Sequence, residues 1–523
     1  MEPSCIRHTE LPGTSRLFAD FNYQFDRVAR FYRYSPHDSA ALPAAAREID
    51  YPDDRRAAMV LALKSQNGDS ESLSRFAKPG TVAVVTGQQV GLFGGPAYTV
   101  YKALTAVRVA RDLSARGIPA VPIFWLASED HDFPEVSLTW GFDASHHPVR
   151  LQVEPPEGAR GRPCPVGGIP LTTPPTADLR RSLSGLPYGD QISALVEDSY
   201  KPGVTMAEGF RALLQSILPQ AGLLFLNPLD PNIRAISIPL VAEALSAAPE
   251  LKTRLLERNR ELTAAGYHAQ VHLEPKTSLF FMLECGERVA LRLKDSEFAT
   301  LRDRAAEVSP NALLRPVMQD YLLPTVAYVG GPAELAYFAQ SQVLYDRLLG
   351  RMPVVLSRCG FTLLDTRAEK LLKRYQLRFR DVLTHEESLQ QRLAHALVPE
   401  GVERYFDETS AEIDSRLRGL GAEVAGFDPT LAAALQKSKA KILHQLEKIR
   451  RKTAREALRR NARAAADAQF LHNLIYPHRH LQERFYSILP FLAQHGLDLV
   501  DRLLHSTGGA TGQECPDHRI LTI

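Results

Sequence analysis

The feature that most constrains this chain is a short apolar run that ends in a glycine-containing turn and is followed by a helix-like segment. Residues 81–85 (TVAVV) form such a run, which is typical of a buried strand. Residues 97–113 follow as a predicted helix, and residues 120–126 (AVPIFWL) as a second buried strand. Strand, helix and strand in this order predict a right-handed crossover between parallel strands, and therefore an α/β core.

The same texture returns three times further along the chain, at residues 222–226 (GLLFL), 325–329 (TVAYV) and 353–356 (PVVL). These runs belong to one parallel sheet only if the stretches between them are insertions, so we expect small inserts at about 141–200 and 255–305. The second insert contains an alternating segment, residues 268–293, with Cys285-Gly286-Glu287 between two strand-like runs. That pattern predicts a β-hairpin.

The last third of the chain has a different period, in which apolar residues recur at alternating spacings of three and four. They are Leu372, Tyr375, Phe379, Val382, Leu389 and Leu393, and then Leu435, Ile442, Leu446 and Ile449. This spacing predicts two long helices that pair as an antiparallel coiled-coil hairpin. We therefore divide the chain into a core over 1–363 that begins with helices, an arm over 364–476, a return to the core over 477–504 and a mobile tail over 505–523. Because 40 helical residues project ~60 Å, we expect part of the arm to meet a second copy in a homodimer.

Charge and cysteine content exclude several classes of protein. The 62 Lys and Arg residues nearly balance the 60 Asp and Glu residues, so the net charge of +2 demands neither nucleic acid nor an anionic membrane as a partner. The five cysteines are scattered without a CxxC pair, and we expect neither a zinc nor a haem site. No leader segment and no apolar run of ~20 residues is visible, so we expect a cytoplasmic protein without a membrane partner.

Glycines and amides follow the first predicted strand in the segment TGQQVGLFGGP, residues 86–96. Glycines in a strand-to-helix turn let backbone N–H groups approach a ligand, and the N-terminus of the next helix favours a phosphate or a carboxylate. The segment matches neither Walker A nor GxGxxG, and the alternative is a tight turn that needs glycine. Two adjacent glutamines at a strand end favour a site. Its candidate residues are Gly87, Gln89, Gly91, Gly95 and Lys102 for binding and Gln88 for catalysis.

A second polar cluster, Glu129, Asp130, His131 and Asp132, follows the second predicted strand directly. Open α/β sheets bind ligands at the carboxyl ends of their strands. Three carboxylates beside an imidazole need a cation, an amine or a hydrogen-bond network to balance them. They could hold Mg²⁺ through water, receive a substrate ammonium, or place His131 as a general base. We take all four as candidate catalytic residues, against the alternative of a solvated acidic turn, and leave the metal open.

A third stretch, residues 314–334, again ends a strand in Gly-Gly-Pro and opens a helix. It echoes the earlier Gly94-Gly95-Pro96, so two anion-binding turns could face one cleft. The candidate binding residues are Gln319, Asp320, Gly330, Gly331 and Glu334. The alternatives are that Glu334 stabilises the helix dipole and that Gln319 and Asp320 cap a loop.

The helix predicted over residues 437–463 carries eleven Lys and Arg residues against Glu447 and Glu456. Such a helix could bind nucleic acid or an acidic partner. The alternative is the solvated face of a coiled coil. We favour the solvated face and expect no nucleic-acid partner.

Four segments together resemble one protein family. They are TGQQVGLFGGPAYTVYKA (86–103), PIFWLASEDHDFPEV (122–136), LRPVMQDYLLPTVAYVGGPAELAY (314–337) and NLIYPHRHLQER (473–484). They look like the BshC family, the cysteine ligases of bacillithiol synthesis, over most of the chain. The resemblance implies a Rossmann-like core with small connecting inserts, a coiled-coil arm used for dimerisation, and the joining of cysteine to glucosaminyl-malate.

Joining a free carboxylate to an amine is uphill in water, so this reaction needs an activated carboxylate. We expect ATP to supply it, with Mg²⁺ as a candidate companion. An alternative of another class is a coiled-coil interaction protein with a nucleotide-binding head, and a third is a nucleotidyl transferase. Convergence of Gln88, residues 129–132 and Gln319 on one cleft would favour an enzyme.

Overall fold

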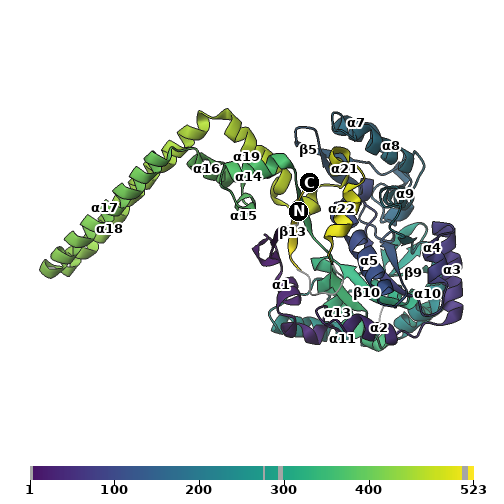
Figure 1. Cartoon of the computed structure of the whole chain (residues 1–523). Helices are drawn as coiled ribbons and strands as arrows, with labels where there is room; N and C mark the ends of the chain where they lie inside the picture. The colour runs from purple at the N-terminus through teal and green to yellow at the C-terminus, as the bar shows by residue number, and fades with distance from the viewer. Residues whose placement is uncertain (1–3, 275–276, 292–297, 509–515) are drawn as a thin grey trace. The chain divides into compact units, whose positions relative to one another are not determined.

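The structure of the chain is a computed structural model that describes residues 4–274, 277–291, 298–508 and 516–523 (Figure 1). Their contacts divide them into two compact units. One contains the residues up to 362 together with 483–521, and the other contains residues 363–482. Within these described ranges, no helix is both long enough and apolar enough to cross a membrane.

A five-stranded parallel sheet forms the centre of the first unit. From one edge to the other its strands are β11 (Val354–Ser357), β10 (Thr325–Gly330), β2 (Val82–Gln88), β3 (Ala120–Leu126) and β6 (Leu224–Leu226). β2 is the first strand of this sheet along the chain. β3 and β6 follow on one side of it, and β10 and β11 then follow on the other side. This doubly wound, Rossmann-like topology confirms the predicted α/β core, and all five strands lie where apolar runs predict them.

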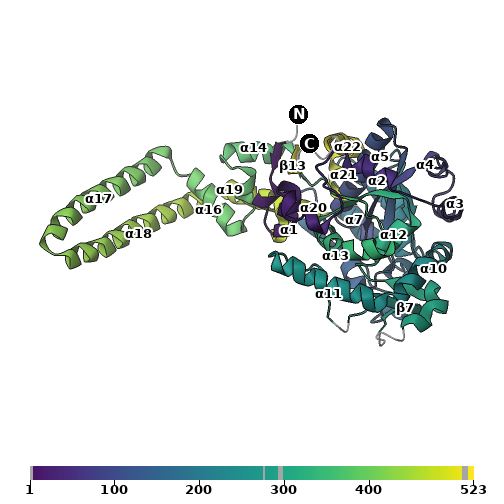
Figure 2. The same cartoon turned by 90° about the horizontal axis from the view of Figure 1, so that it is seen from below.

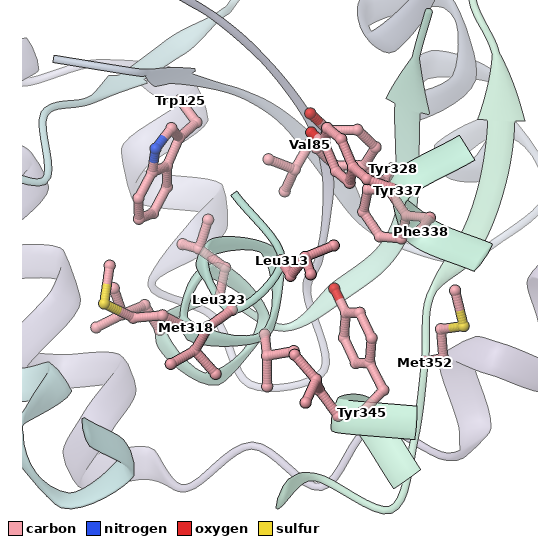
Figure 3. Close-up of a cluster of buried hydrophobic side chains, with 14 of the residues drawn as sticks. Val85, Trp125, Leu313, Met318, Leu323, Tyr328, Tyr337, Phe338, Tyr345 and Met352 are labelled. Atoms are coloured by element: carbon pink, nitrogen blue, oxygen red, sulfur yellow. The ribbon is translucent and has the colours of Figure 1, made fainter. Parts of the chain in front are cut away.

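Helices cover both faces of the sheet. They are α5 (Tyr98–Ala115) on one face and α3 (Asp53–Asn67), α10 (Pro231–Ser246) and α13 (Pro332–Leu348) on the other. Val82 and Val84 of β2 pack in the cluster that contains α5, whereas Ala83 and Val85 pack in the other cluster. Figure 3 shows Val85 and Trp125 in this second cluster. Strands that are buried on both faces have nearly continuous apolar sequences, which is why the sequence identifies them.

Long connections separate the strands. Between β3 and β6 the chain forms α6 (Phe133–Val136), β4 (Leu138–Phe142), β5 (Pro148–Gln152), α7 (Thr176–Leu183), α8 (Gly189–Ser199) and α9 (Met206–Ile217). Between β6 and β10 it forms α10, α11 (Ala248–Ala264), β7 (Phe280–Glu284), β8 (Glu287–Ala290), β9 (Val308–Pro310) and α12 (Arg315–Leu322).

The hairpin predicted in the second connection is present where the structure describes it. β7 and β8 pair antiparallel, and Cys285 and Gly286 form the turn with φ of 51° and 78°. Positive φ at both central residues belongs to the two-residue turn whose twist matches the flanking strands. β9 pairs with β7 as a third strand that the sequence pattern does not predict. Residues 275–276 and 292–293 of the predicted segment lie outside the described residues.

The two ends of the chain pair with each other. β1 (Ser4–Ile6) runs antiparallel to β13 (His518–Thr522). The prediction of a mobile tail over 505–523 is therefore wrong for its last residues, because His518 and Leu521 are buried in this strand. Residues 509–515 lie outside the described residues. The remaining elements are α1 (Arg16–Tyr23), α2 (Ala41–Arg47), α4 (Glu71–Phe76), β12 (Phe361–Leu364), α20 (Gln482–Phe485), α21 (Leu489–His495) and α22 (Leu499–Ser506).

The second unit contains the predicted coiled-coil hairpin, but its first helix comes from a different segment. α17 (Glu400–Phe427) and α18 (Pro429–Arg459) lie side by side in both views (Figures 1 and 2). The predicted first long helix is instead three short ones, α14 (Thr366–Arg374), α15 (Phe379–Val382) and α16 (Glu386–Ala396). Gln376, with φ of 51°, interrupts it, because a helix cannot continue through that conformation.

The pairing surface of the hairpin also differs from the prediction. Its half-buried apolar residues are Phe406, Ile413, Leu417 and Val424 on α17 and Leu435, Leu443 and Leu446 on α18. Ile442 and Ile449, which the heptad pattern places in the seam, are 44% and 52% exposed. The second predicted helix ends at Arg459, and after Asn461 a separate helix, α19 (Ala462–Ile475), follows.

Candidate active site

A cavity of about 290 Å³ lies at the carboxyl ends of β2 and β10. These strands are neighbours, but the chain runs from β2 toward the β6 edge of the sheet and from β10 toward the opposite edge, at β11. Open α/β sheets bind ligands at such a switch point. The predicted site residues that line the cavity are Gly87, Gln88, Gln89, Lys102, Asp130, Gln319, Gly331 and Glu334. Gln88, Asp130 and Gln319 therefore converge on one cleft, whereas Glu129, His131 and Asp132 do not, so the arrangement expected of an enzyme is present in part.

Lys102 of α5 connects the two strand ends. Its side chain is 3% exposed, and its Nζ donates to the backbone oxygen of Gly87 and to Oε1 of Gln88, both at 2.9 Å. The same ammonium forms an ion pair with Glu334. Burial lowers the pKa of Lys102, and Glu334 opposes that shift. Because an ammonium has three N–H donors, these contacts leave none for the anion that the sequence analysis assigns to Lys102.

Glu334 joins the first turn of α13 to its surroundings. One carboxylate oxygen, Oε2, accepts the backbone N–H of Gly331 at 2.7 Å, and the other, Oε1, accepts the hydroxyl of Tyr328 at 2.6 Å. A carboxylate in a first turn interacts favourably with the helix dipole, so Glu334 also has the role that the alternative prediction gives it. The ion pair with Lys102 adds a link from α13 to β2 that the dipole alone would not require.

A glutamine bridges two carboxylates at another part of the cavity wall. Nε2 of Gln89 donates to Oδ2 of Asp130 and to Oε2 of Glu135, both at 2.8 Å. Burial alone would raise the pKa of Asp130, but the hydrogen bonds from Gln89 and from the backbone N–H of His131 hold it below its ordinary value. Both amide hydrogens of Gln89 are used, so its Oε1 is the atom it offers to a ligand. This acidic wall suits an ammonium group.

Three arginines line the same cavity and make part of its wall basic. Arg315 donates to the hydroxyl of Tyr337 at 3.3 Å, and Arg358 donates through both terminal nitrogens to Glu483, at 2.8 and 2.5 Å. Burial alone would raise the pKa of Glu483, yet Arg358 lowers it to about 2. Arg484 is exposed. Guanidinium groups bind carboxylates and phosphates in a fixed, two-point geometry, so this wall suits an anion.

The glycine-rich loop does not present its backbone to the cavity. The N–H groups of Gly94 and Gly95 donate within the loop, to Gly91 and Leu92 at 3.2 and 3.0 Å. Gly94 and Gly95 have φ of 84° and 66°, and a Cβ on Gly91 would lie 3.0 Å from the Cα of Gly95. The structure thus places Gly91 and Gly95 in a tight turn that needs glycine, outside the cavity lining.

The carboxylates of the acidic cluster after β3 do not lie in one place. Asp130 lines the cavity, whereas Glu129 is buried in an ion pair with Arg234 at 2.7 Å. Burial raises the pKa of Glu129, and Arg234 opposes that shift. Asp132 caps the N-terminus of α6, where its Oδ1 accepts the N–H of Glu135 at 3.2 Å. A cap accounts for Asp132 without any role in a reaction.

Three further predicted residues lie outside the lining. His131 accepts a hydrogen bond at Nδ1 from Arg288 of β8. Asp320 is buried and accepts the hydroxyl of Tyr345 at 2.5 Å, and burial raises its pKa to about 6. Gly330 ends β10, where it pairs with β11.

Other lining residues are not among the predicted site residues. They include Tyr98, Trp125, Glu135, Arg315, Tyr328, Tyr337, Arg358 and Arg484. All but Arg358 lie within the four segments that resemble the family, so that resemblance is the sequence feature that could have identified them. Arg358 follows β11, and only its place after a strand could have suggested it.

The residues around the cavity can be compared with what the expected cofactors, Mg²⁺ and ATP, would need. Among the residues it describes, no group of three or more His, Cys, Asp and Glu side chains is placed to hold a metal ion. In the loop expected to cradle a phosphate, the N–H groups of Gly91, Gly94 and Gly95 donate within the loop. A phosphate would therefore fit the arginine-lined wall better than the glycine loop.

Comparison with known proteins covers almost the whole chain. The family described as "Bacillithiol biosynthesis BshC, N-terminal Rossmann-like domain" matches residues 1–359, and "Bacillithiol biosynthesis BshC, C-terminal coiled-coil domain" matches residues 361–514. A protein of Solibacter usitatus named "Putative cysteine ligase BshC" is 52% identical over the full length of both chains. Proteins of the same name from Koribacter versatilis and Salinibacter ruber are 35% and 34% identical, over 100% and 94% of both chains.

Proposed function

Because the chain belongs to the BshC family of bacillithiol biosynthesis and is a ligase, we propose that it forms the amide bond between the carboxyl group of cysteine and the amine of glucosaminyl-malate. The observation that carries the proposal is the mixed charge of the cavity at the switch point. Acidic and basic walls in one cavity suit substrates that bear both an ammonium and carboxylates.

In this proposal the two walls have different tasks. Asp130 and Glu135, joined by Gln89, receive the amine of the acceptor. Arg315, Arg358 and the exposed Arg484 bind carboxylate or phosphate oxygens. Holding both reactants in one orientation is itself a large part of the rate acceleration that such a site can supply.

The proposal includes a nucleotide as the source of activation. A carboxylate oxygen of cysteine attacks a phosphoryl group of ATP, which gives an acyl adenylate and pyrophosphate or an acyl phosphate and ADP. The amine then attacks the activated carbonyl, and AMP or phosphate leaves. The arginine-lined wall supports a site for the anionic parts of these species.

The test is ligation by the purified protein with cysteine, glucosaminyl-malate, ATP and Mg²⁺, followed by mass spectrometry of the thiol and of the nucleotide products. We expect amide formation together with either AMP or ADP. Asp130→Asn should lower turnover by ~10²-fold, the scale of a positioned polar group. Asp132→Asn is the matched control, because it changes a nearby carboxylate that caps α6 outside the cavity.

Two results would contradict the proposal. One is a wild-type protein that consumes nucleotide but forms no amide with these substrates. The other is an equal loss of turnover in Asp130→Asn and Asp132→Asn, since the cavity would then not be the place where the residues act.

We also propose that the coiled-coil hairpin forms a homodimer. The two helices pair with each other through half-buried residues, yet Ile442, Ile449 and Leu431 of α18 remain 44%, 52% and 47% exposed. Replacing both Ile442 and Ile449 with Asp leaves the seam within the hairpin intact and would place unpaired charges in an interface. Light scattering should show a dimer for the wild type and a monomer for this variant. Gln445→Asp is the matched control, and a monomeric wild type at micromolar concentration would contradict the proposal.

A further inference from the structure

A cluster outside the cavity lining fixes the position of one arginine nitrogen. Arg288 of β8 is buried, and its guanidinium stacks on the ring of Phe281 at 3.7 Å. Its Nε donates to the hydroxyl of Ser309 at 3.1 Å, and its Nη2 donates to the backbone oxygen of Pro310 at 2.8 Å. These contacts leave Nη1 beside Nδ1 of His131, at 3.1 Å.

The chemistry of this contact decides which nitrogen of His131 carries hydrogen. A guanidinium has N–H donors and no acceptor, so Nδ1 of His131 accepts the hydrogen bond. A neutral imidazole in this contact then carries its hydrogen on Nε2. A general base that acts through Nε2 would need the hydrogen on Nδ1 instead, where it would face the N–H of Arg288.

The other charged groups around His131 do not remove this constraint. Oδ1 of Asp130 lies 3.8 Å from Nδ1 of His131. However, Oδ1 already accepts the backbone N–H of His131 at 2.7 Å, and Oδ2 accepts Nε2 of Gln89. Glu129 is buried in its ion pair with Arg234. The direct contact at Nδ1 is the one from Arg288.

We propose that Arg288 is a positioning residue that holds His131 in its Nε2–H tautomer, so that His131 does not act as a general base through Nε2. The consequence for ligation rests on the proposed function. The tautomer does not, because it follows from the contact with Arg288 alone.

The tautomer can be measured without any reaction. Nitrogen–proton correlation spectra of the full-length protein labelled with ¹⁵N-histidine should show an unprotonated Nδ1 and a protonated Nε2 for His131 at pH 7, assigned by their loss in His131→Gln. Arg288→Met should abolish this preference. Ser309→Ala is the matched control, since it removes a partner of Arg288 and leaves the contact with His131. An Nδ1–H signal in the wild type, or no change in Arg288→Met, would overturn the proposal.

The absence of a general-base role has a separate test in the ligation assay. Loss of a general base costs ~10²-fold or more in turnover, so we expect His131→Gln to stay within about tenfold of the wild type. A loss of ~10²-fold or more in His131→Gln would overturn this part of the proposal. A wild type without ligation activity would overturn the proposed function, and the spectra would still decide the tautomer.

Discussion

The turns that follow β2 and β10 have similar sequences, with Gly-Gly-Pro before a helix, but different structures. After β2, Gly94 and Gly95 have positive φ and belong to a loop that bonds to itself. After β10, Gly331 has φ of −89° and leads directly into α13, where it lines the cavity with Glu334. Gly94 and Gly95 thus let the first turn form its own backbone hydrogen bonds, whereas the second turn forms part of the cavity wall.

This difference shows that the number of glycines in a turn does not measure its capacity to bind an anion. In the first turn the residues that reach the cavity are Gly87, Gln88 and Gln89, which precede the Gly91–Gly95 loop. What joins the two turns is Lys102, which extends from the helix after the first turn to Glu334 of the second. The following predictions test this distinction between a structural turn and a functional one.

The largest effect is expected from Lys102→Met, which removes the link between the turns. It leaves the carboxylate of Glu334 largely buried without its ion-pair partner, so the free energy of unfolding should fall by about 3–5 kcal/mol. Turnover should fall by ~10²-fold or more, because Gln88 also loses its donor. Urea unfolding and the ligation assay measure the two effects.

The double variant with Lys102→Met and Glu334→Gln separates them. Removing both charges should restore much of the stability, since no unpaired buried carboxylate is left, but it should not restore turnover. If both stability and turnover recovered, Lys102 would contribute to stability alone and would not act as a link within the site.

A smaller effect is expected from Gln89→Leu, which removes the amide between Asp130 and Glu135. Asp130 is partly buried and Glu135 is exposed, so water replaces part of the lost donor. We therefore expect a loss of about 0.5–1.5 kcal/mol in the free energy of unfolding, the net value of a hydrogen bond, and ~10-fold or more in turnover. Gln89→Glu is nearly equal in size and adds a third carboxylate, so it should be worse than Gln89→Leu. The opposite order would mean that the bridge between the carboxylates is unimportant.

The sequence predicts the sheet well because each strand is buried on both faces, as Val82 to Val85 illustrate. It also identifies half of the polar cavity wall, because Gln88, Gln89 and Asp130 stand where strands end. It does not identify Arg358, whose partner Glu483 is 125 residues away along the chain. Contacts of that separation depend on the folded topology and leave no local pattern.

The arm shows a second limit of the sequence. The segment from Leu372 to Leu393 has coiled-coil spacing, yet it forms three short helices, because spacing alone does not reveal the break at Gln376. The helix that pairs with α18 has its apolar residues, such as Phe406 and Ile413, spaced among many charged ones. Its seam is partly formed by ion pairs, as between Asp414 and Lys439 at 2.8 Å, which an apolar pattern cannot detect.

A matched pair of alanine variants tests the comparison of the turns directly. Gly95→Ala forces a Cβ onto a residue with φ of 66° and ψ of −158°, a region nearly restricted to glycine, so it should cost about 1–3 kcal/mol of stability and leave turnover nearly unchanged. Gly331→Ala meets no such strain and should change stability by less than about 0.5 kcal/mol. Its Cβ would lie 3.4 Å from Oε2 of Glu334 and 3.6 Å from Nε of Arg358, so turnover should fall. If Gly95→Ala impairs turnover more than Gly331→Ala does, the comparison fails.

The smallest effect is expected from pH, and it again concerns Lys102. Burial lowers the pKa of Lys102, against the opposing effect of Glu334, so the side chain should lose its proton at a lower pH than an ordinary lysine at ~10.4. Turnover should then decline at a lower pH than the titration of an ordinary lysine predicts, because the neutral amine no longer pairs with Glu334.

The free energy of unfolding should change with pH in the opposite direction to turnover. In the pH range between the folded and unfolded pKa values of Lys102 the unfolded chain binds more protons, so this group makes the free energy of unfolding rise with pH. A decline of turnover below the pH at which an ordinary lysine titrates, without unfolding, and its displacement to higher pH in Lys102→Arg would support Lys102 as the link between the turns. Identical profiles for the two proteins would exclude it.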